Sequence, residues 1–281
     1  PQDIEFHLFA SSKSAGEKLT VNNEDLVIKE LNSENIEKYD IALFSAGGER
    51  SKTFAENFTS QGSYVIDNSS AFRLHEEVPL VVYGINQNEI TSTTKLIANP
   101  NCTTMGLVMA LKPLHDKFSL VSMTPVAYQA VSGSGSEAVS SLRKEESLDD
   151  KSLAEYKDGY YTRPIARNVI PLAGNLLDNG YSDEEMKFVH ESKKILGIPE
   201  LVVEPSNARV GVLTGHGVFC SAVFENEINT DEAIQELNNF EGVQYWSETL
   251  ATPLDAENKY DVLVSRLRMG LSSSKIINFW W

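Results

Sequence analysis

The chain has 281 residues, a formal net charge of −16 and a hydrophobic content of 41%. This length suffices for two domains with cores of their own. The acidic charge argues against nucleic acid and anionic membranes as partners, although a few local Lys and Arg residues can still attract an anionic small molecule. No apolar run is long enough to cross a bilayer, and no signal-peptide pattern opens the chain.

The two cysteines, Cys102 and Cys220, form neither a disulfide framework nor a metal-binding spacing, and the five histidines are scattered. We therefore expect a reducing, cytoplasmic location and no metal site.

The first hundred residues alternate predicted strands with a predicted helix. Strand patterns cover 4–9, 41–44, 64–66 and 96–98, and a helix pattern covers 51–58. Such alternation predicts a parallel, doubly wound sheet, in which ligands bind at the carboxyl ends of the strands. No G-x-G-x-x-G motif occurs in the chain.

Two loops that follow these strands contain candidate ligand-binding residues. The small residues of 10–16, with Lys13 among them, suit a phosphate, but the same composition is typical of an ordinary loop. Arg73 follows the third strand, where it is either a ligand-binding residue or a solvated surface arginine.

The segment Asn99-Pro100-Asn101-Cys102 lies between the strand pattern 96–98 and a helical pattern that begins at Met105. Cys102 is therefore expected at a strand-to-helix turn, near the positive end of a helix. That position lowers the pKa of a thiol and supplies N–H groups for an oxyanion. The alternative is a buried structural cysteine.

The second half begins with a strand over 120–128, in which Pro125 suggests a sheet edge or a bulge. A helix over 137–146 follows, and the aperiodic segment 147–163 is interpreted as a loop or lid.

Another helix is predicted over 183–196, where Ser182 and Glu185 form a capping box. Glu185 and Lys187 lie two positions apart and by default are solvated. His216 lies between two glycines, where a ligand or backbone can come close. Further predicted elements are strands over 201–204, 208–213, 217–224, 260–267 and 275–281, and a helix over 230–240.

Taken together, these motifs resemble the aspartate-β-semialdehyde dehydrogenases. The resemblance covers nearly the whole chain and is carried by residues 12–16, 42–48, 66–73, 98–104, 110–115, 128–133, 184–187, 209–210, 215–216 and 252–255. It implies an incomplete Rossmann-like parallel-sheet cofactor domain over 1–101. It also implies an α+β catalytic and dimerisation domain with a mixed sheet over 102–281.

The resemblance also implies roles for single residues. Cys102 would be the nucleophile that forms a thioester, and His216 the general acid/base that activates it. Arg209 would clamp the substrate carboxylate. The other implied roles are orientation of substrate and thioester by Gln129, further substrate binding by Asn101, contact of Glu185 with the substrate amino group, phosphate binding by Arg73 and Lys187, and NADP binding by Lys13, Ser14, Ser132 and Gly133.

The implied reaction is the NADP-dependent reductive dephosphorylation of aspartyl β-phosphate to aspartate β-semialdehyde, which leads to lysine, methionine and threonine. The implied assembly is a homodimer. The resemblance further implies a Gly-rich loop before Pro1 and a helix after Trp281, while Lys13, Gly84 and Arg167 depart from the usual family residues.

Two other functions remain open at this point. One is N-acetyl-γ-glutamyl-phosphate reductase, whose cysteine follows Pro-Gly, whereas Cys102 follows Pro-Asn. The other is a non-catalytic paralogue or fragment that only binds or dimerises.

Overall fold

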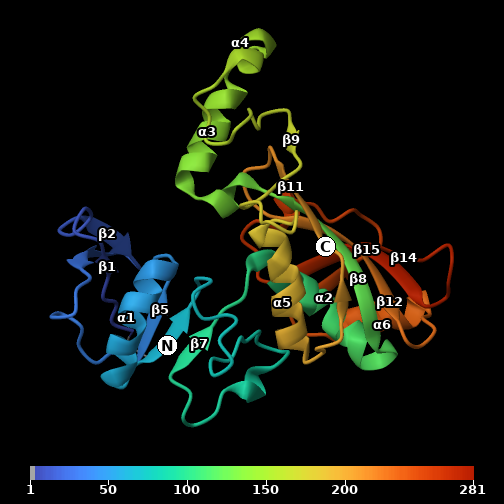
Figure 1. Ribbon diagram of the computed structural model, residues 1–281, viewed down its shortest axis with the longest axis horizontal. Helices are drawn as coiled ribbons and strands as arrows, with labels where there is room; N and C mark the ends of the chain where they lie inside the picture. Colours follow the sequence, from blue (N-terminus) through green and yellow to red (C-terminus); the bar gives the residue numbers. More distant parts are fainter. Residues whose placement is uncertain (1–3) are drawn as a thin grey trace. The chain divides into compact units, whose positions relative to one another are not determined.

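The computed structural model describes residues 4–281. The chain forms two compact units (Figure 1). Unit 1 comprises the chain up to Val81 and Asn88–Pro100, and unit 2 comprises Val82–Gln87 and Asn101–Trp281. Each unit is described by itself.

The centre of unit 1 is a parallel sheet of β5 (Ile41–Phe44), β6 (Tyr64–Asp67) and β7 (Leu96–Ala98), joined in that order. Helix α1 (Gly48–Ser60) connects β5 with β6 and packs against β6. The apolar side of α1 places Ala55 and Phe58 in a core with Phe44 and Val65. The predicted parallel α/β arrangement is thereby confirmed.

The beginning of the chain differs from its prediction. Of the strand expected over 4–9, only its last residue is extended, in β1 (Phe9–Ala10), which pairs with β4 (Lys29–Glu30). Because β4 has only two residues, residues 4–8 have no strand partner in the part of the chain that the structure describes. Unit 1 also contains the hairpin of β2 (Lys18–Val21) and β3 (Glu24–Val27), and η1 (Gln87–Glu89) lies at its border with unit 2.

Within residues 4–281, unit 2 contains an eight-stranded mixed sheet. Its path runs β13-β14-β15-β12-β8-β11-β9, and β10 also pairs with β8. The strands are β8 (Leu120–Gln129), β9 (Val169–Ile170), β10 (Val202–Val203), β11 (Ser206–Val210), β12 (Gly217–Phe224), β13 (Val243–Trp246), β14 (Val262–Met269) and β15 (Ile276–Trp280). The predicted α+β region with a mixed sheet is confirmed.

Helix α2 (Cys102–Phe118) packs on β8, β12 and β14, and it contacts α5 (Asp183–Leu196) and α6 (Thr230–Asn239). One turn, α7 (Pro253–Ala256), precedes β14. Since α2 lies against the central strands, its first residue is fixed relative to the sheet by a buried apolar contact rather than by a loop.

Pro125 was predicted to mark a sheet edge or a bulge. It lies at neither, because β8 runs between β12 and β10/β11 and the register shift of β8 with β12 falls at Val223/Phe224. The parallel partners of β8 are interrupted at this proline: β10 pairs with residues up to Met123, and β11 pairs from Val126 onward. Pro125 thus occupies the gap in the ladder, where its missing N–H removes no strand hydrogen bond.

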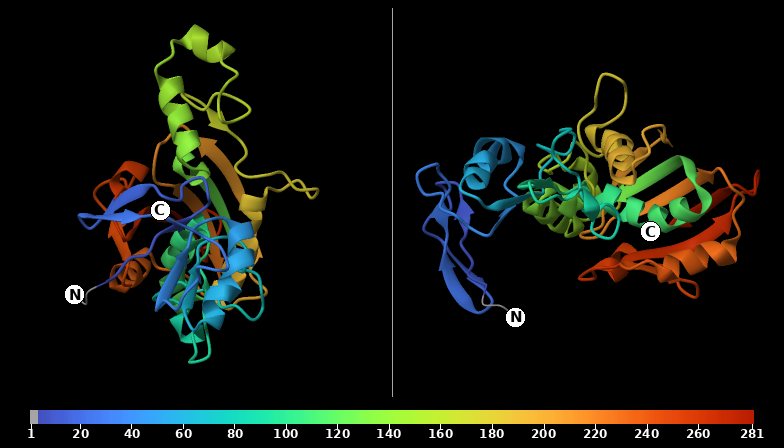
Figure 2. Two further views of the ribbon diagram at one scale, coloured as in Figure 1. Left: turned by 90° about the vertical axis from the view of Figure 1, so that its left-hand side faces the viewer. Right: turned by 90° about the horizontal axis from the view of Figure 1, so that it is seen from below.

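An arm of unit 2 stands out from the sheet in Figure 1 and in the left-hand view of Figure 2. It consists of α3 (Ser136–Glu146), α4 (Asp150–Glu155) and the return segment to β9, and it follows η2 (Val131–Ser134). The segment 147–163 therefore includes a short helix that the sequence pattern did not indicate, capped by Asp149 through the N–H of Ser152 at 2.7 Å. Glu145 of α3 is fully buried, and its carboxylate accepts hydrogen bonds from the N–H groups of Ile165 and Ala166, at 2.6 and 2.9 Å. These bonds attach the return segment to α3.

Candidate active site

Cys102 is the first residue of α2 and is exposed. Asn101 caps the helix: its Oδ1 accepts the backbone N–H of Thr103 at 3.1 Å and the Thr103 hydroxyl at 2.6 Å. The thiol therefore lies at the positive end of a 17-residue helix. This position stabilises negative charge on the sulfur. Cys220, by contrast, is fully buried, and burial raises the pKa of its thiol, as expected for a packing residue.

Three further candidate residues gather at one end of the unit 2 sheet. Gln129 ends β8 and is the parallel partner of Arg209 in β11. His216 directly precedes β12, whose first residue, Gly217, pairs with Tyr128. Because the three strands are neighbours, the sheet brings Gln129, Arg209 and His216 to the same end.

Arg209 is a buried cation. The residue is only 5% exposed, and its Nη1 donates a hydrogen bond to the carbonyl oxygen of Ala130 at 2.8 Å. Within residues 4–281 no ion pair joins it to a carboxylate, and its Nε and the Nε2 of Gln129 have no hydrogen-bond partner. A buried charge without a counterion is costly, so this pair of donors suits an anionic ligand. The ring of Tyr161 lies 5.9 Å from the guanidinium carbon.

The imidazole of His216 is oriented by backbone. The N–H of Ala130 donates to Nδ1 at 3.0 Å. The pKa of His216 is lowered from 6.5 to about 4: burial is the largest cause, the positive charge of Arg209 also lowers it, and the charge of Glu184 acts in the opposite direction. The ring is therefore neutral near pH 7, with its hydrogen on Nε2.

Glu184, in the first turn of α5, interacts both with His216 and with the beginning of α2. Its Oε2 accepts a hydrogen bond from Nδ2 of Asn101 at 3.1 Å, and its Oε1 forms an ion pair with Lys187. The side chain is close enough for its charge to affect the pKa of His216. Glu184 was not singled out from the sequence, although its spacing of three from Lys187, which places both on one helix face, is the signal that could have found it.

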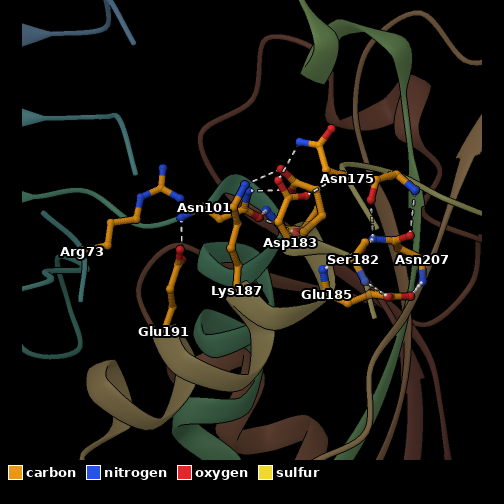
Figure 3. A network of polar contacts seen from close by, with 12 residues as sticks. Arg73, Asn101, Asn175, Ser182, Asp183, Glu185, Lys187, Glu191 and Asn207 are labelled. Carbon is orange, nitrogen blue, oxygen red and sulfur yellow. Dashed lines mark hydrogen bonds and ion pairs between the residues drawn. The ribbon is translucent and has the colours of Figure 1, made fainter. Parts of the chain in front are cut away.

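Glu185 has a structural position instead (Figure 3). Its Oε2 accepts the N–H of Ser182 at 2.7 Å, which completes the predicted capping box, and its Oε1 accepts the N–H of Asn207 at 2.9 Å. The side chain of Asn207 in turn bonds both polar groups of the Ala173 backbone and the Ser182 hydroxyl. With both carboxylate oxygens bound to backbone, Glu185 fixes the start of α5 to β11.

Gly133, in η2, borders the imidazole and the guanidinium. A Cβ at this position would lie 3.2 Å from Nη1 of Arg209, 3.2 Å from Cε1 of His216 and 3.4 Å from Nε2 of His216. The neighbouring Ser132 is held by its N–H to the carbonyl of Leu213 at 3.1 Å. The absence of a side chain at Gly133 thus keeps the approach to both groups open.

The unit 1 candidates lie at strand ends, as predicted. Arg73 is buried and donates to the carbonyls of Asn68 and Asn99, at 3.0 and 2.8 Å, which follow β6 and β7. Lys13 is exposed and Ser14 half-buried in the turn after β1, where the N–H of Ser14 bonds the carbonyl of Ser11 at 3.0 Å. An exposed ammonium beside a hydroxyl is a donor set that fits a phosphate.

Among the described residues, no group of His, Cys, Asp and Glu could hold a metal ion, and no helix is long and apolar enough to cross a membrane.

Comparison with known proteins places the chain in a family. Residues 1–93 match the description "Semialdehyde dehydrogenase, NAD binding domain", and residues 111–281 match "Semialdehyde dehydrogenase, dimerisation domain". Aspartate-semialdehyde dehydrogenase of Corynebacterium glutamicum is 42% identical over 276 residues, which are 92% of this chain and 80% of the relative. The chain belongs to the aspartate-semialdehyde dehydrogenase family. The enzyme of that name from Bacillus subtilis is 36% identical, over 97% of this chain and 82% of the relative.

Solved structures of the family share the fold. Aspartate semialdehyde dehydrogenase II of Vibrio cholerae, complexed with ASA, has a TM-score of 0.91 and 33% identity, and the match covers 99% of this chain and 83% of that one. The Candida albicans enzyme with NADP has a TM-score of 0.72 at 22% identity, covering 98% of this chain and 85% of that one, which supports the fold alone. The match of residues 1–93 to the NAD-binding domain indicates a nicotinamide cofactor.

Proposed function

We propose that this protein reduces aspartyl β-phosphate to aspartate β-semialdehyde with NADPH, through a thioester on Cys102. The observation that carries the proposal is the buried, uncompensated guanidinium of Arg209 beside the unbonded amide of Gln129, on strands adjacent to His216. The relatives from Corynebacterium glutamicum and Bacillus subtilis bear the name of this activity, and the Vibrio cholerae structure is complexed with ASA. The product would supply lysine, methionine and threonine synthesis.

Cys102 acts as the nucleophile in this proposal. Its sulfur is exposed at the start of α2, where backbone N–H groups and the helix dipole stabilise the thiolate. The thiolate attacks the acyl carbon, and the carbon–oxygen bond to phosphate breaks. A thioester accepts hydride more readily than a carboxylate does, which explains the use of cysteine.

Arg209 and Gln129 bind the substrate. The guanidinium offers a planar set of donors for the α-carboxylate, and the Gln129 amide lies beside it at the parallel register position. Glu184 replaces Glu185 as the residue proposed to contact the substrate amino group, because both oxygens of Glu185 are bound to backbone. Asn101 contributes by holding Glu184 and capping α2.

Lys187 and Arg73 are proposed to bind the phosphate group. Lys187 lies on α5 beside Glu184 and gives the site a cation that pairs with the anion of the substrate. Arg73 offers a second guanidinium in unit 1.

NADP is the proposed cofactor. Lys13 and Ser14 would hold its 2′-phosphate, although Lys provides a point charge and not the fork of an arginine. Ser132 and Gly133 would border the nicotinamide end. When bound, the cofactor supplies the hydride that reduces the thioester.

A homodimer is proposed through the sheet face of unit 2 opposite α2. Residues whose side chains lie on that face include Val126 and Tyr128 in β8, Phe219 in β12 and Trp280 in β15, as their register shows. Tyr128 remains 38% exposed and packs its ring 5.8 Å from that of Trp280. An apolar, aromatic sheet face of this kind is typical of an obligate interface.

The decisive test is the oxidation of aspartate semialdehyde, followed by absorbance of NADPH, with and without phosphate. We expect turnover that requires phosphate and NADP. Cys102→Ser should abolish it while the circular dichroism spectrum stays unchanged, because a serine hydroxyl is not ionised near neutral pH. Turnover by the serine variant, or none by the wild type, would contradict the proposal.

A further inference from the structure

Tyr161 lies in the return segment of the arm, and its side chain reaches the group around Arg209. The guanidinium carbon of Arg209 lies over its ring, 5.9 Å from the ring centre. The Tyr161 hydroxyl donates a hydrogen bond to the hydroxyl of Ser134 at 2.9 Å. Ser134 ends η2 and directly follows Gly133, where a Cβ would lie 3.2 Å from Nη1 of Arg209. One side chain of the arm therefore contacts both Arg209 and the turn that borders it.

The backbone on either side of Tyr161 is attached to α3. The N–H of Tyr160 donates to Oγ of Ser141 at 2.9 Å, and this hydroxyl donates to Oε1 of Glu145 at 3.1 Å. The other oxygen of Glu145, which is fully buried, accepts the N–H groups of residues 165 and 166. The segment that carries Tyr161 is thus bound to the helix both before and after this residue, so the position of its ring is set by the arm.

Arg209 is oriented by few other contacts. Its Nη1 donates to the Ala130 carbonyl at 2.8 Å, and its Nε has no hydrogen-bond partner among the residues described. Binding a carboxylate through two parallel N–H groups requires a fixed orientation of the guanidinium plane. The face of an aromatic ring attracts a cation, but it does not occupy the N–H groups as a carboxylate would. The ring of Tyr161 can therefore hold the guanidinium and still leave its donors for a ligand.

We propose that Tyr161 is a positioning residue for the substrate. Its ring holds the guanidinium of Arg209 in the orientation that binds the α-carboxylate, and its hydroxyl fixes Ser134 at the end of η2. The inference rests on the proposed function, which supplies the carboxylate, and it makes the arm part of the substrate site. Tyr161 acts through Arg209 and takes no part in the chemistry at Cys102.

A purely structural role is the alternative, because Tyr161 also packs against the apolar core of the arm. That core contains Val131, Ala138, Leu142, Leu153, Ile165 and Ala166. Loss of packing would weaken the arm whatever residue occupies position 209. Loss of an orienting contact would matter only while position 209 carries a guanidinium, whose plane has to be oriented. The two roles therefore differ in how replacements at positions 161 and 209 combine.

A double-mutant cycle measures this difference in the phosphate-dependent oxidation of aspartate semialdehyde. In the otherwise wild-type protein, Tyr161→Leu should lower kcat/KM by about 3- to 30-fold, the value of one desolvated cation–π contact. In the Arg209→Lys background the same change should cost less than about twofold, since an ammonium has no plane to orient. Equal losses in both backgrounds would give Tyr161 a structural role and overturn the inference, while the activity of the wild type stands. A wild type without turnover would instead refute the proposed function, and this inference with it.

Tyr160→Leu is the matched control. The ring of Tyr160 packs edge-on against that of Tyr161, with 5.0 Å between ring centres, and the residue is 47% exposed. Its hydrogen bond to Ser141 comes from the backbone and survives the substitution. We expect kcat/KM within about twofold of the wild-type value. A loss as large as that of Tyr161→Leu would mean that packing of the arm, and not the contact with Arg209, accounts for the effect.

Fluorinated rings test the contact while the packing is kept. Tyr161→Phe should retain more activity than Tyr161→Leu, because it keeps the ring and lacks only the bond to Ser134. Phenylalanines with an increasing number of ring fluorines at position 161 then remove the negative charge of the ring face step by step. Across this series kcat/KM should fall stepwise, by about 3- to 30-fold in total, with Tm unchanged. A flat series in a protein that turns over overturns the inference, even if Tyr161→Leu does not fold.

Discussion

Nδ2 of Asn101 donates to Oε2 of Glu184 at 3.1 Å, so the residue that precedes Cys102 is tied to the first turn of α5. Glu184 also forms an ion pair with Lys187 and influences His216 electrostatically. One carboxylate therefore connects the beginning of α2, a candidate phosphate ligand and the imidazole of His216.

Replacement by glutamine should affect activity at Glu184 and stability at Glu185, although the two residues are neighbours in α5. Glu184→Gln should lower kcat/KM for aspartate semialdehyde by about tenfold to a hundredfold, the value of one charge-assisted contact, with little change in Tm. Glu185→Gln should instead lower the free energy of unfolding by about 1–3 kcal/mol, because an amide donor would face the N–H of Ser182 or Asn207. Steady-state kinetics and urea unfolding measure both, and the reversed pattern would assign the substrate contact to Glu185.

Arg209→Lys should lower kcat/KM by about tenfold to a hundredfold, because an ammonium lacks the planar pair of donors that binds a carboxylate. The bond from Nη1 to the Ala130 carbonyl would also be lost, so the orientation of His216 would weaken. The measurement compares aspartate semialdehyde with an analogue that lacks the α-carboxylate. Equal losses for both substrates would show that Arg209 acts only through the structure.

Gly133→Ala should impair the active site without destabilising the fold. The added methyl would lie 3.2 Å from Arg209 Nη1 and from His216 Cε1, which is close enough to displace both side chains. A displacement of this kind costs about tenfold to a hundredfold in kcat/KM. Gly48→Ala is the matched control, because its Cβ would meet only the Cβ of Ala71, at 3.9 Å. Unchanged kinetics for the Gly133 variant would mean that the two side chains are free to yield.

Sequence patterns predicted the elements that have a clear hydrophobic period. The capping box of Ser182 and Glu185, the glycine that ends α5 and most strands of both sheets follow from local chemistry, whereas β9 and β13 were not predicted. The interior position of β8 did not, because the gap that accommodates Pro125 is formed by β10 and β11, which lie more than seventy residues away in the sequence.

For the site, Cys102 and His216 stand out by their neighbours in sequence, the helix start and the two glycines. The tautomer of His216 is different, since it depends on Ala130, 86 positions away. The choice between Glu184 and Glu185 likewise depends on which carboxylate the backbone of Asn207 meets. Contacts between distant segments leave no local pattern, and these are the features that only the fold supplies.

The stability of the protein should fall between pH 6.5 and about 4 because of His216. Its pKa is about 4 in the folded state, against the usual 6.5, so the unfolded chain binds a proton first as the pH decreases. The stabilisation is complete above pH 6.5 and is lost progressively below it, by about 2 kcal/mol at about pH 5. His115, whose pKa is also lowered by burial, contributes in the same direction.

Urea unfolding of the wild type and of His216→Gln, at about pH 7 and about pH 5, isolates the contribution of His216 because His115 is common to both proteins. The wild type should lose about 2 kcal/mol more than the variant over this range. Parallel pH dependences would show that the ring charges freely in the folded protein. In that case the N–H of Ala130 would not hold Nδ1 as its acceptor.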